Sequence, residues 1–462
     1  ETDSRQGDVM LTYQLKKSPG VPLYEALYRC IRQDILSGKL PAHGKLPSKR
    51  ALAVHLEVSK ITVEAAYNQL LAEGFIRSQE KVGYFVEPLQ KQPAASVWKE
   101  AEDSPDDNLI DLTGGSPSHF PFSVWSRLQR EVMLDLGEEL LLPLHKQGLP
   151  SLRNAIARHL NQFRGMQVDP DNILIGAGTD FLYNLLVQLL GRDKRYGVEE
   201  PGYSKIQKIY EAAGAACNLL TPDKEGVDPE DLGDTQVLHI SPSHHFPSGI
   251  VMSNPRRQAL LGWAAEQPDR WIIEDDYDSE FRFNAHPLPA LHTLNGGEKV
   301  IYLNTFSKTL APSIRISYMV LPGCLMKEFR EKLGFYSCTV PSFEQHTLER
   351  FISRGFFEKH INRMRKSYKS IRNRVLAAIT GCSQAAHFTI LEEHAGLHFL
   401  LQVDLPLTDA QLVEKCRELG LRVAALSNYY RFPEENSHCL VVNYSGLTEE
   451  TLSQLEHILD NL

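Results

Sequence analysis

The sequence predicts an α/β protein of two domains, a small helical unit at the N-terminus and a large unit built on a mainly parallel sheet covered by helices. The chain has 462 residues, which is too long for one ordinary hydrophobic core. Residues 11–87 show short helical patterns followed by a hairpin pattern, whereas β-rich runs alternate with helical stretches through residues 108–462. The segment 88–107 is rich in Pro, Ala, Ser and charge, which is typical of a linker.

The charge of the chain is divided unevenly between these parts. The whole chain carries a net charge of −9, but the segment from Leu11 to Pro88 has 11 Lys and Arg against 7 Asp and Glu. That segment therefore carries +4, and the remainder of the chain carries −13. A basic head on an acidic body is typical of a DNA-binding module joined to a metabolic domain.

Composition argues against a membrane protein, a disulfide framework and a metal site. Apolar runs such as Phe181–Leu190 are half of the roughly 20 residues that cross a bilayer, so we expect a cytoplasmic protein without a membrane segment. The seven cysteines are scattered, with no CxxC pair and no metal-ligand spacing. We therefore expect free thiols in a reducing compartment and no bound metal.

The head shows the signals of three helices and a hairpin. Apolar residues recur every four positions between Pro22 and Ser37, which predicts an amphipathic helix. Ser48 and Ser59 are each placed to cap a further helix, the second of which runs from about Lys60 to Glu73. The segment Phe75–Glu87 has a strand-turn-strand pattern. This order predicts a winged helix-turn-helix.

The segments KLPSKRALAVHLEVSKITVEAAYNQLLAEGFI and KVGYFV resemble the GntR family of bacterial regulators. The resemblance implies that the head binds double-stranded promoter DNA through Pro47, Ser48, Arg50, Ser59, Lys60, Thr62 and Gly83. Arg50 and Lys60 can pair with phosphates or guanine edges, although the family usually has Arg at the second position. Ser59 and Thr62 lie at a helix N-terminus, which favours phosphate. The alternative is a protein-protein adaptor whose Lys and Arg form only a solvated face.

Lys308 has the sequence context of a lysine that binds an aldehyde. It lies in TFSKTLAPSIR, just after the apolar strand VIYLN. A lysine forms a Schiff base with an aldehyde, while Thr305, Ser307 and Arg315 offer hydroxyl donors and a planar cation for a phosphate. A lone lysine is usually a surface charge, but these neighbours favour a cofactor site.

Three further motifs follow predicted strands. WIIEDDYDSE places Asp275 and Tyr277 at a strand end, where an aspartate can hold a pyridine nitrogen protonated and a tyrosine can donate to a ring hydroxyl. GAGTD opens a helix, so Gly178 and Thr179 can offer N–H groups to a phosphate. Tyr203 in EEPGYS can stack on a flat ring. Each motif alone is weak, because acidic loops, glycine turns and packed aromatics are common.

Together these motifs resemble, in order and spacing, the fold-type I aminotransferases, which use pyridoxal 5′-phosphate (PLP). With the head included, the chain resembles the MocR/GabR group of regulators, in which the aminotransferase-like domain senses a small molecule. The resemblance implies a homodimer, arranged head to tail. It also assigns the cofactor's aldehyde to Lys308, its pyridine nitrogen to Asp275, its ring hydroxyl to Tyr277, its ring face to Tyr203 and its phosphate to Gly178, Thr179, Thr305, Ser307 and Arg315.

Two positions depart from a working enzyme. Aminotransferases of this fold hold the substrate carboxylate with an arginine near the C-terminus, and LVVNYSGL places Gly446 at the expected position. Losing such a charged pair costs about 2 to 5 kcal/mol. Phe246 stands where the enzymes have an asparagine that hydrogen-bonds the cofactor, and His244 or His245 beside it can replace that contact. We therefore expect a sensor without catalytic residues rather than an enzyme.

The resemblance leaves several functions open. The first is a regulator that senses PLP itself and controls vitamin B6 synthesis, as in the PdxR branch. The second is a sensor of an amino compound, such as γ-aminobutyrate, taurine or a D-amino acid, with Arg315, Lys205 or Arg431 as the anion partner. The third is an active aminotransferase, which the missing arginine disfavours. A DNA-binding protein with a decayed cofactor site is also disfavoured, because Lys308, Asp275 and Arg315 are all present.

Overall fold

The structure is a computed structural model that describes residues 11–13, 15, 22–88, 109–114, 119–283, 289–294, 296–392, 396–432 and 436–461. Internal contacts divide the chain into two units, residues 1–103 and 104–462, which we describe separately as the head and the body. Apart from Pro88, the expected linker 88–107 lies outside the described residues. Within these ranges, no helix has the length and apolar character needed to cross a bilayer.

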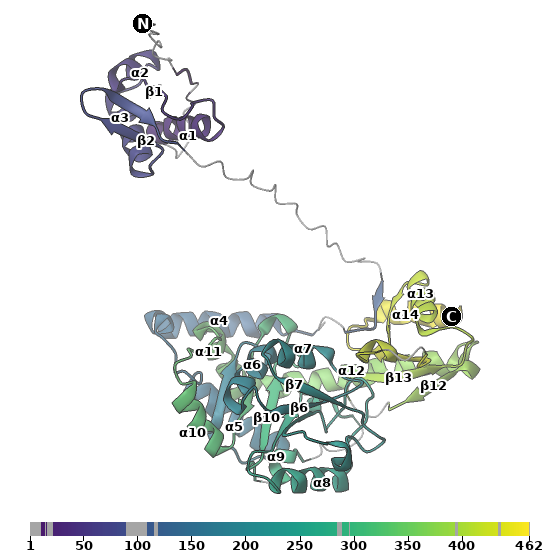
Figure 1. Ribbon diagram of the computed structural model, residues 1–462. Coiled ribbons are helices and arrows are strands. Elements are labelled where there is room, and N and C mark those ends of the chain that lie inside the picture. Colours follow the sequence, from purple (N-terminus) through teal and green to yellow (C-terminus); the bar gives the residue numbers. More distant parts are fainter. Residues whose placement is uncertain are drawn as a thin grey trace. The chain divides into compact units, whose positions relative to one another are not determined.

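The head combines three helices with a small antiparallel sheet (Figure 1). Its helices are α1 (Leu23–Leu36), α2 (Lys49–His55) and α3 (Lys60–Ala72). Its strands are β1 (Lys45–Leu46), β2 (Ile76–Gln79) and β3 (Gly83–Val86), in the order β1-β3-β2. The predicted winged helix-turn-helix is confirmed. The sequence does not predict β1, because two residues are too few to show a strand pattern.

Local caps and a shared core stabilise these helices. The side chains of Ser48 and Ser59 accept hydrogen bonds from the backbone N–H groups of Ala51 and Thr62, as predicted for N-cap serines. Helices α1 and α3 bury their apolar faces in one core, which contains Leu27, Ile31, Ile35, Val63, Tyr67 and Leu70. Because most isolated helices are marginal in water, this shared core is what holds the three helices together.

The body contains a seven-stranded sheet in the order β5-β11-β10-β9-β8-β6-β7. The strands are β5 (Ile173–Gly176), β6 (Arg195–Glu199), β7 (Ala216–Leu220), β8 (Val237–Ile240), β9 (Trp271–Asp275), β10 (Val300–Thr305) and β11 (Ser317–Val320). Strand β11 is antiparallel to both of its neighbours, and the other pairings are parallel. The mainly parallel sheet is therefore confirmed, and the carboxyl ends of β6, β8, β9 and β10 meet at one edge.

Helices cover both faces of this sheet. One face packs against α6 (Thr179–Leu190), α7 (Ser204–Ala212) and α10 (Gly323–Lys332). The other packs against α4 (Phe122–Leu136), α5 (Pro150–Arg164), α8 (Asn254–Ala265), α9 (Leu291–Leu294) and α11 (Ser342–Ser353). Strand β10 shows the alternation, because Ile301 and Leu303 join the first core while Val300 and Tyr302 join the cores of the second face.

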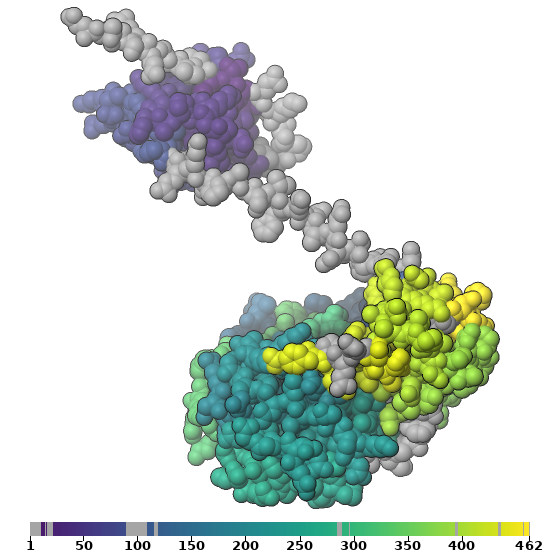
Figure 2. Space-filling model, turned by 45° about the vertical axis from the view of Figure 1, so that its right-hand side comes forward, coloured from purple at the N-terminus to yellow at the C-terminus, as the bar shows by residue number. Residues whose placement is uncertain are grey.

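The C-terminal part of the body forms a second, smaller sheet. This part of the body begins with the long helix α12 (Phe356–Gly381) and also contains the helices α13 (Asp409–Glu418) and α14 (Glu449–Leu459). The strands are β12 (Phe388–Leu391), β13 (His398–Val403), β15 (Ala424–Ala425) and β16 (Cys439–Asn443), paired in the order β12-β13-β16-β15. Strand β14 (Leu421–Arg422) pairs with β4 (Ile110–Asp111). Figure 2 shows this yellow-green part packed against the teal part of the body.

Candidate functional site

The body holds a cavity of about 370 Å³ where parallel strands end and the C-terminal sheet begins. Strands β8, β9 and β10 bring His239, Asp275 and Thr305 to it, and β13 and β16 bring His398 and Asn443. Eight of the nine predicted cofactor residues line this cavity: Thr179, Tyr203, Asp275, Tyr277, Thr305, Ser307, Lys308 and Arg315. The ninth, Gly178, lies directly beside the Arg315 guanidinium.

Asp275 occupies the buried floor of the cavity. Its Oδ2 accepts a hydrogen bond from the Tyr183 hydroxyl at 2.5 Å and lies 3.4 Å from Nε2 of His239. Its Oδ1 is buried and has no hydrogen-bond partner among the described residues. A buried carboxylate oxygen without a donor is costly, so this position calls for a donor from a ligand. A protonated pyridine nitrogen fits that requirement.

Gly178 and Arg315 form a tight corner at the N-terminus of α6. A Cβ atom on Gly178 would lie 2.3 Å from the Arg315 Nη2, and the backbone at Gly178 has φ +89°. Only glycine fits this position without displacement. Arg315 itself has φ +50° and pairs with Asp180 at 3.0 Å, and Lys205 reaches the same carboxylate at 2.6 Å. Two cations and a helix N-terminus thus converge on one corner, which suits a phosphate.

Hydroxyl groups continue this corner along the end of β10. The Ser317 hydroxyl donates to Oγ1 of Thr305 at 2.8 Å, and the Thr305 hydroxyl donates to Oγ of Ser307 at 3.1 Å. Lys308 follows Ser307, has an exposed side chain and lines the cavity. The hydroxyl groups of Thr305 and Ser307 and the amine of Lys308 therefore line the same cavity.

The structure adds residues that the motifs do not show. Tyr183 lies one helical turn after Thr179, so the spacing within α6 is the signal that could have identified it. Glu199 ends β6 and accepts from the Ser241 N–H at 2.9 Å, and burial raises its pKa to about 8. His398 pairs with Asn443 across β13 and β16. That pairing depends on strand register, and nothing in the sequence shows it.

Strand β16 brings Asn443, and not Gly446, to the cavity. Gly446 lies beyond the end of this strand and is not among the residues that line the cavity. The residue of β16 that lines the cavity is Asn443, and the alternation of a strand places Val441 on the same face. Neither residue is an arginine, so this strand brings no guanidinium to the cavity. A side chain at position 443 would therefore reach the cavity from this strand.

Three cationic side chains in addition to Lys308 line the cavity. Besides Lys205 and Arg315 at Asp180, Arg431 pairs with Glu211 at 2.8 Å. All three cations line the cavity and each has a carboxylate partner. An anionic ligand would therefore bind here by joining or replacing existing ion pairs.

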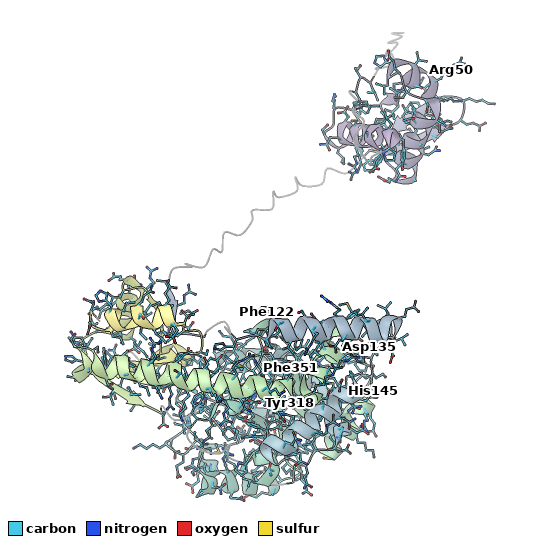
Figure 3. All side chains as sticks on the ribbon, turned by 180° about the vertical axis from the view of Figure 1, so that it is seen from behind. Arg50, Phe122, Asp135, His145, Tyr318 and Phe351 are labelled. Atoms are coloured by element: carbon cyan, nitrogen blue, oxygen red, sulfur yellow. The ribbon has the colours of Figure 1, made fainter. Side chains whose placement is uncertain are left out.

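The predicted DNA-binding residues of the head fall into two groups. Arg50 and Lys60 are exposed on α2 and α3, and Figure 3 shows Arg50 at the surface of the head. Ser48, Ser59 and Thr62 lie at helix N-termini, where the two serines cap their helices and the hydroxyls of Ser59 and Thr62 are 2.8 Å apart. Gly83, with φ +136°, begins β3.

Pro47 differs from these residues in its burial. It is buried in the head, and its carbonyl accepts a hydrogen bond from the Tyr67 hydroxyl at 2.9 Å. Its contact with DNA stays a prediction.

Comparison with protein families gives two matches. Residues 23–86 match the family described as bacterial regulatory proteins, gntR family. Residues 107–459 match the family described as aminotransferase class I and II.

Among solved structures, a kynurenine aminotransferase of Pyrococcus horikoshii is similar with a TM-score of 0.66 and 25% identity, covering 77% of this chain and 91% of that chain. A multiple substrate aminotransferase of Thermococcus profundus has a TM-score of 0.68 and 22% identity, again over 77% and 91%. The body therefore has the aminotransferase fold.

Curated relatives share the whole arrangement. The uncharacterized HTH-type transcriptional regulator YdeL of Bacillus subtilis is 38% identical, over 96% of this chain and 97% of its own length. The pyridoxine biosynthesis transcriptional regulator PdxR of Corynebacterium glutamicum is 32% identical over 87% of both chains. The probable rhizopine catabolism regulatory protein MocR of Rhizobium meliloti is 31% identical over 95% and 93%. The chain therefore belongs to the MocR-type HTH transcriptional regulators, which join a gntR-family DNA-binding domain to an aminotransferase class I and II domain.

Proposed function

We propose that this regulator binds pyridoxal 5′-phosphate in the body cavity and couples its occupancy to promoter binding by the head. The observation that carries this proposal is the unpartnered, buried Oδ1 of Asp275. It lies in the same cavity as Lys308 and the phosphate-binding corner of Thr179, Thr305, Ser307 and Arg315. One ligand that carries a protonated ring nitrogen, an aldehyde and a phosphate satisfies all three parts.

Each residue has a defined task in this proposal. When bound, the cofactor supplies an aldehyde that condenses reversibly with primary amines. Lys308 offers the amine, and Asp275 holds the ring nitrogen protonated through a charge-assisted hydrogen bond. Tyr277 donates to the ring hydroxyl, and Tyr203, which is half exposed at the cavity, covers the ring. Gly178 leaves room for Arg315 beside the phosphate.

We further propose that the ligand sensed is PLP itself, in the service of vitamin B6 synthesis. Strand β16 presents Asn443 to the cavity, with Val441 on the same face, so it offers no guanidinium for the carboxylate of an amino acid. Without that clamp an amino donor is poorly oriented, which argues against turnover as an aminotransferase. The similarity to a pyridoxine biosynthesis regulator supports the same choice.

A second candidate is a sensor of an amino compound that carries an anionic group. Lys205 and Arg431 line the cavity, and their partners Asp180 and Glu211 are partly exposed. An anionic amine could replace these carboxylates. This candidate differs from the first in one respect, because it requires an added amine to react at the cofactor.

In this proposal residues 11–87 bind DNA, residues 88–107 form the linker and residues 108–462 bind the ligand.

We also propose that the protein forms a homodimer. Helix α4 runs from near Phe122 to near Asp135 (Figure 3) and exposes Phe122 and Leu134, with Leu141 and Leu142 exposed just beyond it. Met133 is exposed as well, so five large apolar side chains are exposed between residues 122 and 142, which supports a protein interface. A dimer would give two heads for paired half-sites.

The test is an absorbance spectrum of the purified protein with PLP, followed by DNA binding. We expect a band at about 420 nm in wild type that is absent in Lys308→Ala and retained in Lys327→Ala, which changes an exposed lysine on α10. If PLP alone changes promoter affinity and amines leave the band unchanged, PLP is the ligand sensed. A band that shifts with an amine favours the second candidate, and steady turnover with a 2-oxo acid would make the protein an enzyme. Absence of the band in wild type would refute cofactor binding.

A further inference from the structure

Behind the cavity wall, Tyr277 is in contact with a buried histidine and aspartate that the cofactor assignment does not use. His244 and Asp278 are each 3% exposed. Nδ1 of His244 lies 2.9 Å from Oδ2 of Asp278 and 3.3 Å from the Tyr277 hydroxyl oxygen. Nε2 of His244 is buried without a partner in the described ranges, so Nδ1 is the ring nitrogen engaged in hydrogen bonding.

The charges around this contact determine where its protons lie. An ionised carboxylate only accepts hydrogen bonds, so Asp278 requires the proton to be on Nδ1 of His244. Nδ1 then has no lone pair for the Tyr277 hydroxyl, which must direct its own proton elsewhere. Burial raises the pKa of Tyr277 well above 10, and the carboxylates of Asp278, Asp275, Glu199 and Asp276 act in the same direction. Tyr277 therefore keeps its proton, and the cavity that it lines is the free direction.

The fold makes room for this histidine. A Cβ on Gly396 would lie 1.8 Å from Cε1 of His244, so a side chain at 396 would displace the ring. The His398 ring packs against the other side, with centroids 4.4 Å apart. Phe246, on the same segment as His244, also lines the cavity and has no polar atom to offer. Gly396 and His398 both belong to the segment that leads into β13, so this segment holds the His244 ring in place.

We propose that His244 and Asp278 are positioning residues that aim the Tyr277 hydroxyl proton into the cavity, at the ring hydroxyl oxygen of the bound cofactor. This inference rests on the proposed cofactor site. His244 and Asp278 determine the direction of one hydrogen bond, so they act only through Tyr277. With the cofactor bound, a hydrogen bond from Tyr277 would stabilise negative charge on the ring oxygen, most of all when the nitrogen joined to the cofactor's aldehyde carbon carries no proton. The intact network should therefore lower the pH at which the visible band is lost.

The experiment is a pH titration of the cofactor's visible band in the full-length protein, with circular dichroism as the check on folding. We expect the midpoint to rise by about one pH unit in Tyr277→Phe and by about half a unit in His244→Ala. The double variant should match Tyr277→Phe, because His244 acts through that residue. His244→Asn retains an N–H donor near the position of Nδ1 and should restore most of the wild-type midpoint. His292→Ala is the matched control, since His292 is also buried but lies on α9 and is not among the residues that line the cavity.

The outcomes separate this inference from the proposed function. A wild-type band with an unchanged midpoint in His244→Ala overturns the positioning role and leaves cofactor binding intact. Additive shifts in the double variant also overturn it, because His244 would then act independently of Tyr277.

The side chains of His244, Asp278 and His398 offer three ligand atoms within 4.8 Å of one another. Stoichiometric zinc in the purified protein that is lost in His244→Ala would assign the histidine to a metal instead. If wild type forms no Lys308-dependent band, the proposed function fails and this inference falls with it.

Discussion

The two walls of the cavity are built in different ways. The first wall consists of the carboxyl ends of parallel strands, and its functional groups come in short contiguous motifs around Asp275 and Lys308. The second wall comes from the C-terminal sheet, where single residues such as His398 and Asn443 reach the cavity from separate strands. In the proposed function, the first wall holds the cofactor, whereas the second determines what else can bind beside it. A sensor can therefore retain the first wall of an enzyme and differ from it in the second.

The largest effect is expected when the negative charge of Asp275 is removed from the first wall. Asp275→Asn retains the size of the side chain but removes the negative charge that holds a ring nitrogen protonated. We expect cofactor affinity to fall about a hundredfold, because a buried charged partner is lost. Titration of the visible band measures this affinity. Asp231→Asn, at an exposed position of the same unit, is the control and should bind as wild type does. Equal affinities for the two variants would show that Asp275 does not hold the cofactor.

The next prediction concerns the unliganded protein and pH. The carboxyl of Glu199 releases its proton near pH 4.5 when unfolded, whereas burial holds the proton up to about pH 8 in the folded protein. Between these values the folded state binds more protons, so its free energy of unfolding decreases as pH rises, by about 1 kcal/mol per pH unit. Glu199→Gln keeps an acceptor for the Ser241 N–H and should flatten the decrease.

Denaturant unfolding from pH 5 to 8 measures this difference. Burial also raises the pKa of Glu280 to about 8. Because Glu280 is present in both proteins, its contribution to the pH dependence of unfolding is the same in each and cancels in the comparison. Parallel pH curves for wild type and Glu199→Gln would contradict the prediction.

A smaller effect is expected at the phosphate corner. Gly178→Ala places a Cβ 2.3 Å from the Arg315 Nη2 at a backbone φ of +89°, which should cost about 2 kcal/mol of stability and lower the thermal midpoint. Gly262→Ala is the matched control. It lies inside α8 with no atom within 4 Å of the new Cβ, so it should raise stability by about 0.5 to 1 kcal/mol. Equal midpoints for the two variants would show that the corner is not tight.

The two walls also explain which features the sequence could predict. The motifs of the first wall and the caps at Ser48 and Ser59 are local, because neighbouring residues supply both the element and the functional group. The burial of Pro47 is not visible in its local motif, because its carbonyl is bonded by the hydroxyl of Tyr67, twenty positions away. The pairing of His398 with Asn443 depends on strand register. Counting along LVVNYSGL without that register led to Gly446, which lies beyond the end of β16.

The last prediction compares an arginine at position 443 with an arginine at position 446. Asn443→Arg places a guanidinium at the position where β16 meets the cavity, whereas Gly446→Arg places it beyond the strand. If the second wall decides which ligands fit, Asn443→Arg should retain the cofactor band and bind amines that carry a carboxylate about tenfold more tightly. Gly446→Arg should bind them as wild type does. Amine-induced shifts of the visible band measure both affinities. A gain in Gly446→Arg and none in Asn443→Arg would restore the assignment made from the sequence and place the second wall elsewhere.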